Sequence, residues 1–260
     1  MFKSPGAIAF SLFSYDIHWY GIIMAAAILC GILVIEIIRK KYYKEITQDN
    51  ILDISFLLII FGIISARIYY VILDYKYFIN HIYFIPCIWN GGIAIHGAII
   101  GGIITFLIYA KSNKINFLKY ADLFSFGLIT GQIIGRWGNF FNSEAFGPPC
   151  SLPWKLYIPF MSRPMAYQNY EYFHPTFLYE SMLNILVLII LLFILKYKDK
   201  NKNGIIFFSY LILYSAVRII TETIRIDSVL NISNFHIAHI VSILLLLTGI
   251  IGIVQYRLRH

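Results

Sequence analysis

Long apolar segments separated by charged loops constrain this chain more than any other feature of its sequence. A transmembrane helix needs about 20 consecutive, mostly apolar residues, and seven segments of the chain approach that length. They are Tyr20–Ile38, Ile51–Leu73, Gly91–Ala110, Ala121–Gly138, Pro175–Leu195, Ile205–Thr221 and Phe235–Tyr256. Only 13% of the residues are charged, and 59% are hydrophobic, which is far from the balance of a soluble domain. The sequence therefore predicts an all-α integral membrane protein of seven transmembrane helices, forming one polytopic domain over residues 1–260.

The basic residues are unevenly divided between alternate loops. If the N-terminus lies outside the cell, the inner loops contain thirteen of them: Arg39, Lys40, Lys41, Lys44, Lys111, Lys114, Lys119, Lys196, Lys198, Lys200, Lys202, Arg257 and Arg259. The outer loops contain four: Lys3, Lys76, Lys155 and Arg163. Loops rich in lysine and arginine stay on the cytoplasmic side, so we expect the N-terminus outside, the C-terminus in the cytoplasm and one long outer loop, residues 139–174, after the fourth helix. The net charge of +8 then reflects topology, and no nucleic-acid partner is expected.

Three of the remaining arginines lie inside apolar segments, where a charge is costly unless it is paired or hydrated. Arg67, Arg136 and Arg218 each lie near the C-terminal end of a segment expected to run from inside to outside. His96 lies near the outer start of a segment that runs the other way. A single arginine at a helix end often only extends its charge to the membrane surface. Three at one depth, with polar neighbours, favour a site for an anionic ligand near the outer surface.

The stretch GRWGNFFNSEAFG, residues 135–147, has more polar groups than a helix end requires. Its glycines allow a neighbouring helix or a lipid headgroup to approach the backbone. Arg136 supplies a positive charge that Glu144 is expected to hold. Asn139 and Asn142 can orient a substrate or cap the helix end, although capping alone needs only one of them. The substrate-binding residues expected in this stretch are Asn139, Asn142, Glu144 and Gly147.

The stretch YSAVRIITETIR places Tyr214, Arg218, Glu222 and Arg225 at positions i, i+4, i+8 and i+11. If the helix continues through Arg225, these residues share one face, and Glu222 can bridge the two arginines. One interpretation is a buried ladder of ion pairs that only holds helices together. The other is an anion site, because the stripe has more cations than carboxylates and the planar guanidinium suits phosphate oxygens.

His96 lies in WNGGIAIHGAIIGG, residues 89–102, whose glycines allow close contact between helices. An intramembrane histidine is often a hydrogen-bonded core residue, but the arginines expected at its depth favour a catalytic one, and imidazole titrates near neutral pH. Tyrosines at outer helix ends usually belong to the aromatic belt of a membrane protein. Among them only Tyr20 is retained as a substrate-binding candidate.

Metal and cofactor sites are not indicated. The sequence has no histidine and cysteine spacing typical of a metal site, no phosphate-binding glycine loop and no dinucleotide-binding motif. Cys30 lies in an apolar segment and is expected to pack there. Cys87 and Cys150 can pair only if both face an oxidising compartment, and the sequence leaves this open.

Together these motifs resemble the prolipoprotein diacylglyceryl transferase family of the bacterial cytoplasmic membrane. Residues 135–147 fit the family signature Gly-Arg-x-Gly-Asn-Phe-x-Asn-x-Glu-x-x-Gly at every fixed position. Further matching stretches are HWYG at His18, WNGGIAIHG at Trp89, LPW at Leu152, HPTxLYE at His174 and YxxxRxxxExxR at Tyr214. The chain departs from the family pattern at Ala98, Cys150, Phe177 and His239, and these departures concern the wall of the expected pocket.

The resemblance implies a reaction in which phosphatidylglycerol donates its diacylglyceryl group to the lipobox cysteine of a prolipoprotein signal peptide. A thioether forms and glycerol phosphate leaves. A free cysteine thiol has a pKa of about 8.5 and benefits from a base, a role implied for His96 with Tyr214 as the rival. Arg136 and Arg218 would hold the phosphate oxygens and stabilise the departing charge. The residues implied to bind substrate or orient these arginines are Tyr20, Arg67, Asn139, Asn142, Glu144, Gly147, Glu222 and Arg225.

Two other functions use the same residues. A transporter or channel for organic anions would use the arginines as a filter, and a lipid-binding subunit would use them to hold headgroups without turnover. The sequence indicates neither an acyl-chain preference nor an oligomeric state.

Overall fold

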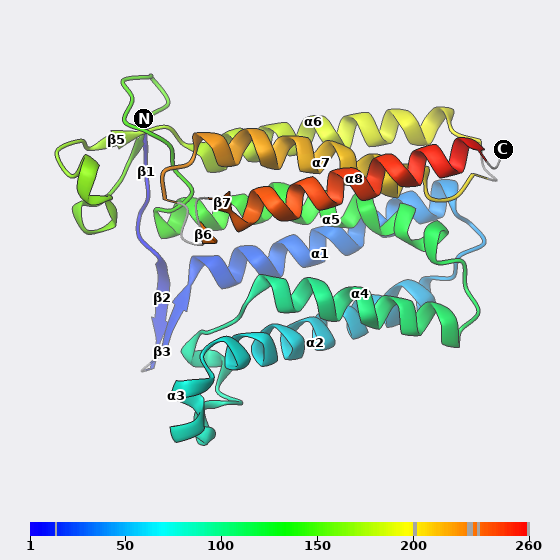
Figure 1. The fold of residues 1–260 in the computed structure, drawn as a ribbon, viewed down its shortest axis with the longest axis horizontal. Coiled ribbons are helices and arrows are strands. Elements are labelled where there is room, and N and C mark those ends of the chain that lie inside the picture. The colour runs from blue at the N-terminus through cyan, green and yellow to red at the C-terminus, as the bar shows by residue number, and fades with distance from the viewer. Residues whose placement is uncertain (14, 200–201, 228–230, 233–234, 259–260) are drawn as a thin grey trace. The chain divides into compact units, whose positions relative to one another are not determined.

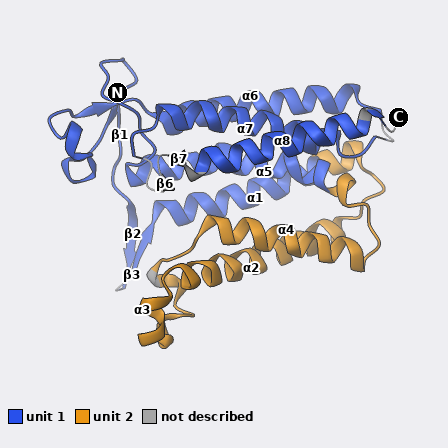
Figure 2. Ribbon diagram, in the orientation of Figure 1, with its two compact units in different colours: residues 1–37, 121–260 blue, residues 38–120 orange. Residues whose placement is uncertain are grey.

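The computed structural model describes residues 1–13, 15–199, 202–227, 231–232 and 235–258. By its internal contacts the chain divides into two compact units, residues 1–37 with 121–260 and residues 38–120 (Figure 2). Of the basic residues counted for the expected topology, Lys200 and Arg259 lie outside the described residues.

Long helices occupy all the segments where transmembrane helices are expected (Figure 1). They are α1 (Trp19–Tyr42), α2 (Gln48–Leu73), α4 (Ile95–Ser112), α5 (Phe117–Asn142), α6 (Thr176–Tyr197), α7 (Ile205–Ile224) and α8 (Ile237–Leu258). Among the described residues, six of these helices are long and apolar enough to cross a membrane, namely α1, α2, α4, α6, α7 and α8. On α1 the side chains of Leu29, Leu33 and Ile37 are each more than 60% exposed and form a stripe at helical spacing, as expected of a surface that faces lipid. The chain is therefore a multi-pass membrane protein.

The remaining long helix, α5, is less apolar than the other six, and protein surrounds much of it. Every residue from Tyr120 to Gly127 is buried, and the backbones of α1 and α5 approach so closely that a Cβ on Gly31 would lie 3.0 Å from the Gly127 carbonyl oxygen. A helix enclosed by other helices contacts little lipid, so it tolerates polar side chains that a lipid-facing helix could not.

Asp122 fixes the start of α7 against α5. Its buried carboxylate accepts hydrogen bonds from the backbone N–H groups of Gly204 (2.9 Å) and Phe207 (2.8 Å), and from Lys198 Nζ (3.0 Å). Gly204 has no side chain to cap the helix, and the first N–H groups of a helix need an acceptor. Asp122 supplies that acceptor from another helix and so sets the position of α7 along α5.

The second unit consists mainly of α2 and α4, with α3 (Tyr75–Asn80) and short 3₁₀ turns at Ile82–Phe84 and Ile88–Asn90 between them. The helix α4 begins at Ile95, so its expected start at Gly91 is wrong. Gly91 and Gly92 have φ angles of 83° and 77°, which are incompatible with a right-handed helix. The predicted close contact between helices is confirmed at Gly97, where an added Cβ would clash with the Ser65 carbonyl oxygen.

Short strands occur outside the long helices, so the all-α description is incomplete. Strands β1 (Phe2–Lys3), β4 (Leu156–Tyr157) and β5 (Tyr172–Phe173) form one sheet in the order β1-β4-β5, with β1 parallel and β5 antiparallel to β4. Two antiparallel pairs are β2 (Ile8–Leu12) with β3 (Tyr15–His18), and β6 (Asn231–Ile232) with β7 (Phe235–His236). Strands of two residues leave no periodicity that a sequence could reveal.

Within the first unit, consecutive helices run in opposite directions, with α7 packed between α6 and α8 (Figure 1). The end of α5, the start of α6 and the end of α7 therefore lie at the same end of the unit. The loop that joins α5 to α6 buries Phe146, Leu156, Ile158 and Phe173 there as a small core of its own.

Candidate functional site

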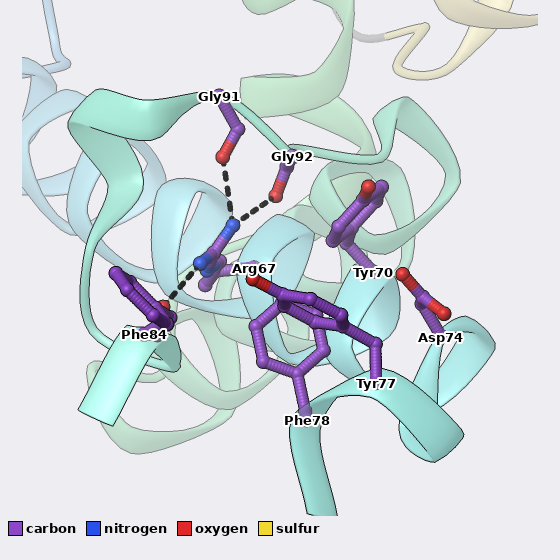
Figure 3. A pocket seen from close by; sticks show the side chains of 8 residues that line it. All are labelled: Arg67, Tyr70, Asp74, Tyr77, Phe78, Phe84, Gly91 and Gly92. Atoms are coloured by element: carbon purple, nitrogen blue, oxygen red, sulfur yellow. Dashed lines mark hydrogen bonds between the residues drawn. The ribbon is translucent and has the colours of Figure 1, made fainter. Parts of the chain in front are cut away.

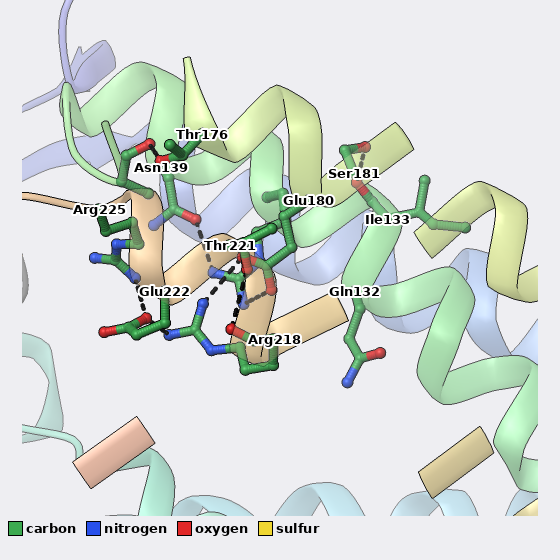
Figure 4. A network of polar contacts seen from close by, with 12 residues as sticks. Gln132, Ile133, Asn139, Thr176, Glu180, Ser181, Arg218, Thr221, Glu222 and Arg225 are labelled. Carbon is green, nitrogen blue, oxygen red and sulfur yellow. Dashed lines mark hydrogen bonds and ion pairs between the residues drawn. The ribbon is translucent and has the colours of Figure 1, made fainter. Parts of the chain in front are cut away.

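The carboxylate of Glu180 on α6 joins arginines from two other helices (Figure 4). Arg136 Nη2, from α5, lies 2.7 Å from Glu180 Oε1, and Arg218 Nη1, from α7, lies 3.0 Å from Glu180 Oε2. The Glu180 side chain is 1% exposed, whereas those of Arg136 and Arg218 are 19% and 15% exposed. The guanidinium groups of two partly exposed arginine side chains are thus held together by one buried carboxylate.

Glu180 is absent from the residues selected from sequence. Among the sequence motifs it occurs only as the last residue of the HPTxLYE stretch at His174. Its signal is nonetheless present, because it is a carboxylate near the start of the apolar α6, and an ionisable residue within a membrane segment is a candidate functional residue in its own right.

The expected role of Glu222 as a bridge is confirmed. Glu222 Oε2 lies 2.7 Å from Arg218 Nη2 and 3.6 Å from Arg225 Nη1. The helix does not continue through Arg225, however. It ends at Ile224, and Arg225 has extended backbone angles, so Arg225 reaches Glu222 from just beyond the helix.

Asn139 and Asn142 lie within α5, which runs four residues beyond its expected end. Their side-chain Nδ2 groups both donate to Glu144 Oε1, at 2.9 and 3.1 Å, and Asn139 Oδ1 accepts from Arg136 Nη1 at 3.4 Å. Glu144 therefore acts on Arg136 through Asn139, and the direct partner of Arg136 is Glu180 instead. Asn139 thus contacts both charged groups and Asn142 contacts Glu144, whereas the expected orientation of a substrate by these asparagines stays a prediction.

The cluster as a whole does not have the excess of arginines over carboxylates that was expected from the stripe on α7. Counting along one helix omits Glu180, which α6 contributes, and Asp227, whose Oδ1 lies 3.1 Å from Arg225 Nε. Around Arg218 the two signs differ in accessibility, because the side chain of Arg218 is 15% exposed and those of Glu180 and Glu222 are only 1% and 4% exposed. Asp227, at 14%, is as exposed as its partner Arg225, at 15%. Each guanidinium has five N–H donors.

Two tyrosines of the first unit lie against this cluster. The Tyr214 side chain lies close to Arg136 and its ring stacks on that of Tyr210. The Tyr20 ring packs on Gly138, where an added Cβ would lie 2.8 Å from Tyr20 Cδ2. The predicted close approach to a glycine is therefore confirmed at Gly138. At Gly135 the nearest atom to an added Cβ is Met24 Sδ at 3.6 Å, an ordinary contact, so the approach of a lipid headgroup there stays a prediction.

Arg67 lies in the second unit, and backbone carbonyls surround its guanidinium (Figure 3). The donors are Nε to Ile85 (2.7 Å), Nη1 to Gly91 (2.7 Å) and Gly92 (2.8 Å), and Nη2 to Phe84 (2.5 Å). The buried arginine thus ties the residues before α4 to the end of α2, beside a cavity lined also by the aromatic rings of Tyr70, Tyr77, Phe78 and Phe84. Its expected contact with substrate stays a prediction.

His96 is the second residue of α4 and is partly buried. Its ring centroid lies 6.1 Å from that of Tyr69 on α2. His96 and Arg67 belong to the second unit, whereas Arg136 belongs to the first. Their expected convergence on one site therefore stays a prediction.

Three motif stretches meet at the start of α6, namely LPW, HPTxLYE and the signature of residues 135–147. The Tyr179 hydroxyl accepts a hydrogen bond from Trp154 Nε1 (3.1 Å) and is bonded to His174 Nδ1 (3.1 Å). Gly147 is close to the same place. Its N–H donates to the His174 carbonyl (2.8 Å), and an added Cβ would lie 2.9 Å from the Ile224 carbonyl oxygen. Gly147 therefore allows the signature loop to contact the end of α7.

Two departures from the family pattern lie in this part of the fold. Phe177 is fully buried, with its ring 5.7 Å from that of Trp137, so it adds apolar packing behind the end of α5. Cys150 lies beside the sheet of β1, β4 and β5, where its N–H donates to the Tyr172 carbonyl. All three cysteines are described residues, and each is a free thiol.

Comparison with known proteins identifies similar chains of nearly the same length. Residues 7–255 match a family model described as prolipoprotein diacylglyceryl transferase. A protein of Acaryochloris marina named phosphatidylglycerol--prolipoprotein diacylglyceryl transferase is 46% identical over 253 residues, covering 97% of this chain and 91% of its own. Proteins with the same name from Synechocystis sp. and Prochlorococcus marinus strain MIT 9301 are 44% and 40% identical, covering 97% and 99% of this chain and 90% and 94% of their own.

Proposed function

The chain belongs to the prolipoprotein diacylglyceryl transferase family, and we propose that the cluster around Arg136 and Arg218 is where it carries out its reaction. The chain is a transferase that performs the diacylglyceryl transfer step of lipoprotein maturation, with phosphatidylglycerol and prolipoprotein as its substrates. The observation that carries the proposal is the Glu180 carboxylate, which holds two partly exposed guanidinium groups from separate helices side by side.

The phosphodiester of phosphatidylglycerol binds to the exposed edges of Arg136 and Arg218. Arg136 donates to Asn139 and Glu180, and Arg218 contacts Glu180 and Glu222, which leaves further N–H groups of each for phosphate oxygens. The lipobox thiol attacks the glyceryl carbon next to the phosphate. The C–S bond forms, the C–O bond breaks and glycerol phosphate leaves with the negative charge that the two arginines stabilise.

The thiol proton passes to a base before it reaches the leaving group or water. His96 is the first candidate because imidazole accepts protons near neutral pH. Tyr214 is the rival, and its contact with Arg136 supports a place near the reacting phosphate. Tyr20, Asn139, Asn142, Glu144, Gly147, Glu222, Arg225 and Arg67 bind substrate or hold the arginines.

The enzyme lies in the bacterial cytoplasmic membrane, with its N-terminus outside and its C-terminus in the cytoplasm. In this arrangement α5 also crosses the membrane, which brings the number of transmembrane helices to seven. The two compact units act as one catalytic domain. The uneven division of lysine and arginine between alternate loops supports the orientation. The arginines then lie near the outer surface, where the translocated precursor presents its lipobox cysteine.

A single incubation tests the reaction. Purified protein is mixed with phosphatidylglycerol and a synthetic lipobox peptide, and mass spectrometry measures a diacylglyceryl adduct on the peptide. A peptide with serine in place of cysteine, and vesicles of zwitterionic lipid only, are the controls. An adduct formed only with the complete mixture supports the proposal. Binding without an adduct would support a lipid-binding subunit, and anion flux without an adduct would support a transporter.

A further inference from the structure

Asp227, just beyond the end of α7, uses both oxygens of its carboxylate on different parts of the fold. Oδ1 lies 3.1 Å from Arg225 Nε. Oδ2 accepts a hydrogen bond of 2.6 Å from the backbone N–H of Ala145, which is 82 residues earlier in the chain. The side chain is only 14% exposed. Asp227 thus joins the exit of α7 to the loop that follows α5.

The loop that Asp227 contacts has an unusual backbone. Ser143 and Ala145 have φ angles of 55° and 57°, a left-handed conformation that residues other than glycine rarely adopt and keep only when their surroundings hold them there. Ala145 is held on both sides. Its N–H donates to Asp227, and its carbonyl accepts from Thr176 Oγ1 and from the Phe177 N–H.

Glu144 lies between these two left-handed residues, so the backbone that Asp227 holds determines where the Glu144 carboxylate points. That carboxylate accepts from Asn139, and Asn139 in turn accepts from Arg136. These contacts therefore form a closed polar ring. They run from Arg136 through Glu180, Arg218, Glu222, Arg225 and Asp227 to Ala145, whose neighbour Glu144 leads back through Asn139 to Arg136.

We infer that Asp227 is a positioning residue for diacylglyceryl transfer, which closes this polar ring and holds Glu144 against Asn139 so that Arg136 faces the phosphate. The inference rests on the proposed function of the arginine cluster. Asp227 itself contacts none of the reacting groups in that proposal. It acts through the loop, because without it the Ala145 N–H loses its acceptor. At the exit of α7, Arg225 would keep Glu222 as its carboxylate partner.

The test is a double-mutant cycle between Asp227 and Glu144. We expect Asp227→Ala to lower kcat roughly 10- to 100-fold, the range for a lost hydrogen bond to a charged group, with little change in KM for the lipobox peptide. If Asp227 acts through Glu144, Asp227→Ala should lower the rate of a Glu144→Ala enzyme, which has no acceptor for Asn139, by no more than about twofold, because residues that act as one unit are not additive. Asp227→Asn keeps an oxygen acceptor for Ala145 and should recover part of kcat.

Each outcome of this cycle either supports or overturns the role inferred for Asp227. Glu171→Gln changes an exposed carboxylate in the long outer loop and is the matched control, expected to keep full activity. Normal kcat in Asp227→Ala, or losses that multiply in the double variant, would overturn the inference while the wild-type enzyme still forms adduct. If the wild type forms no adduct, the proposed function itself fails. Should Asp227→Ala not accumulate in membranes, the same cycle with Asp227→Asn gives the answer, with additive losses again counting against the inference.

Discussion

Arg136 and Arg218 lie on different helices, 82 positions apart in sequence, and share the single carboxylate of Glu180 at 2.7 and 3.0 Å. Two guanidinium groups this close would repel each other without a carboxylate between them. The shared partner keeps both planar groups at a fixed separation before any substrate arrives. Catalysis by electrostatic stabilisation depends on such preorganisation, because no energy is then spent in reorienting the charges during the reaction.

Replacing Arg218 with lysine should not preserve activity. Arg218 uses Nη1 for Glu180 and Nη2 for Glu222, and a single ammonium group cannot reproduce that fork. We expect Arg218→Lys to lower the rate of adduct formation about 100-fold or more, with normal amounts of protein in the membrane. Arg163→Lys, in the loop between α5 and α6, is the control. A rate for Arg218→Lys within a few-fold of wild type would show that only the charge matters.

Glu180→Gln should affect both stability and activity. Removing one partner from a buried ion pair commonly costs about 3–5 kcal/mol, because the other charge is left without compensation, and here two guanidinium groups depend on one carboxylate. Thermal unfolding in detergent should show a lower midpoint, and adduct formation should fall by about 100-fold. The Glu171→Gln enzyme provides the reference for both measurements. An unchanged midpoint together with an unchanged rate would contradict the structural role of Glu180.

Two glycines one turn apart on α5 should respond differently to the same substitution. In Gly138→Ala the new Cβ would lie 2.8 Å from the Tyr20 ring, so the ring must move and activity should fall several-fold. In Gly135→Ala the nearest atom is Met24 Sδ at 3.6 Å, an ordinary contact. Because alanine is a better helix residue than glycine by roughly 0.5–1 kcal/mol, this variant should be fully active and slightly more stable. Equal rates for the two enzymes would mean that the position of Tyr20 is unimportant.

The identity of the base can be read from the pH dependence of the rate. A general base works only when unprotonated, so the wild-type rate should rise with pH and then level off. His96→Gln should lower the plateau and remove this rise, whereas Tyr214→Phe should keep it. If His96→Gln retains the wild-type pH profile, Tyr214 or a water molecule becomes the better candidate.

The positions of the helices and the contacts within one helix could be inferred from sequence because they depend on local properties of the chain. The length and hydrophobicity of each segment determine whether it can form a transmembrane helix, whatever its neighbours are, and long helices occupy every segment where they were expected. A helical repeat likewise determines which residues of one helix share a face, so the contacts of Glu222 with Arg218 and Arg225 could be anticipated. The motifs of residues 135–147 and 214–225 were enough to suggest the family.

The partners of the charges were decided only by the tertiary structure. Whether Arg136 pairs with Glu144 or with Glu180 depends on how far α5 and α6 are rotated and shifted against each other, and no periodicity within one helix contains that information. The same holds for Asp227 and Ala145, which meet because the end of α7 lies beside the loop after α5. Sequence thus determined where the helices form and which charges they bring into the membrane. Packing determined which charges neutralise each other, because an ion pair requires a separation of a few ångströms that only the assembled helices define.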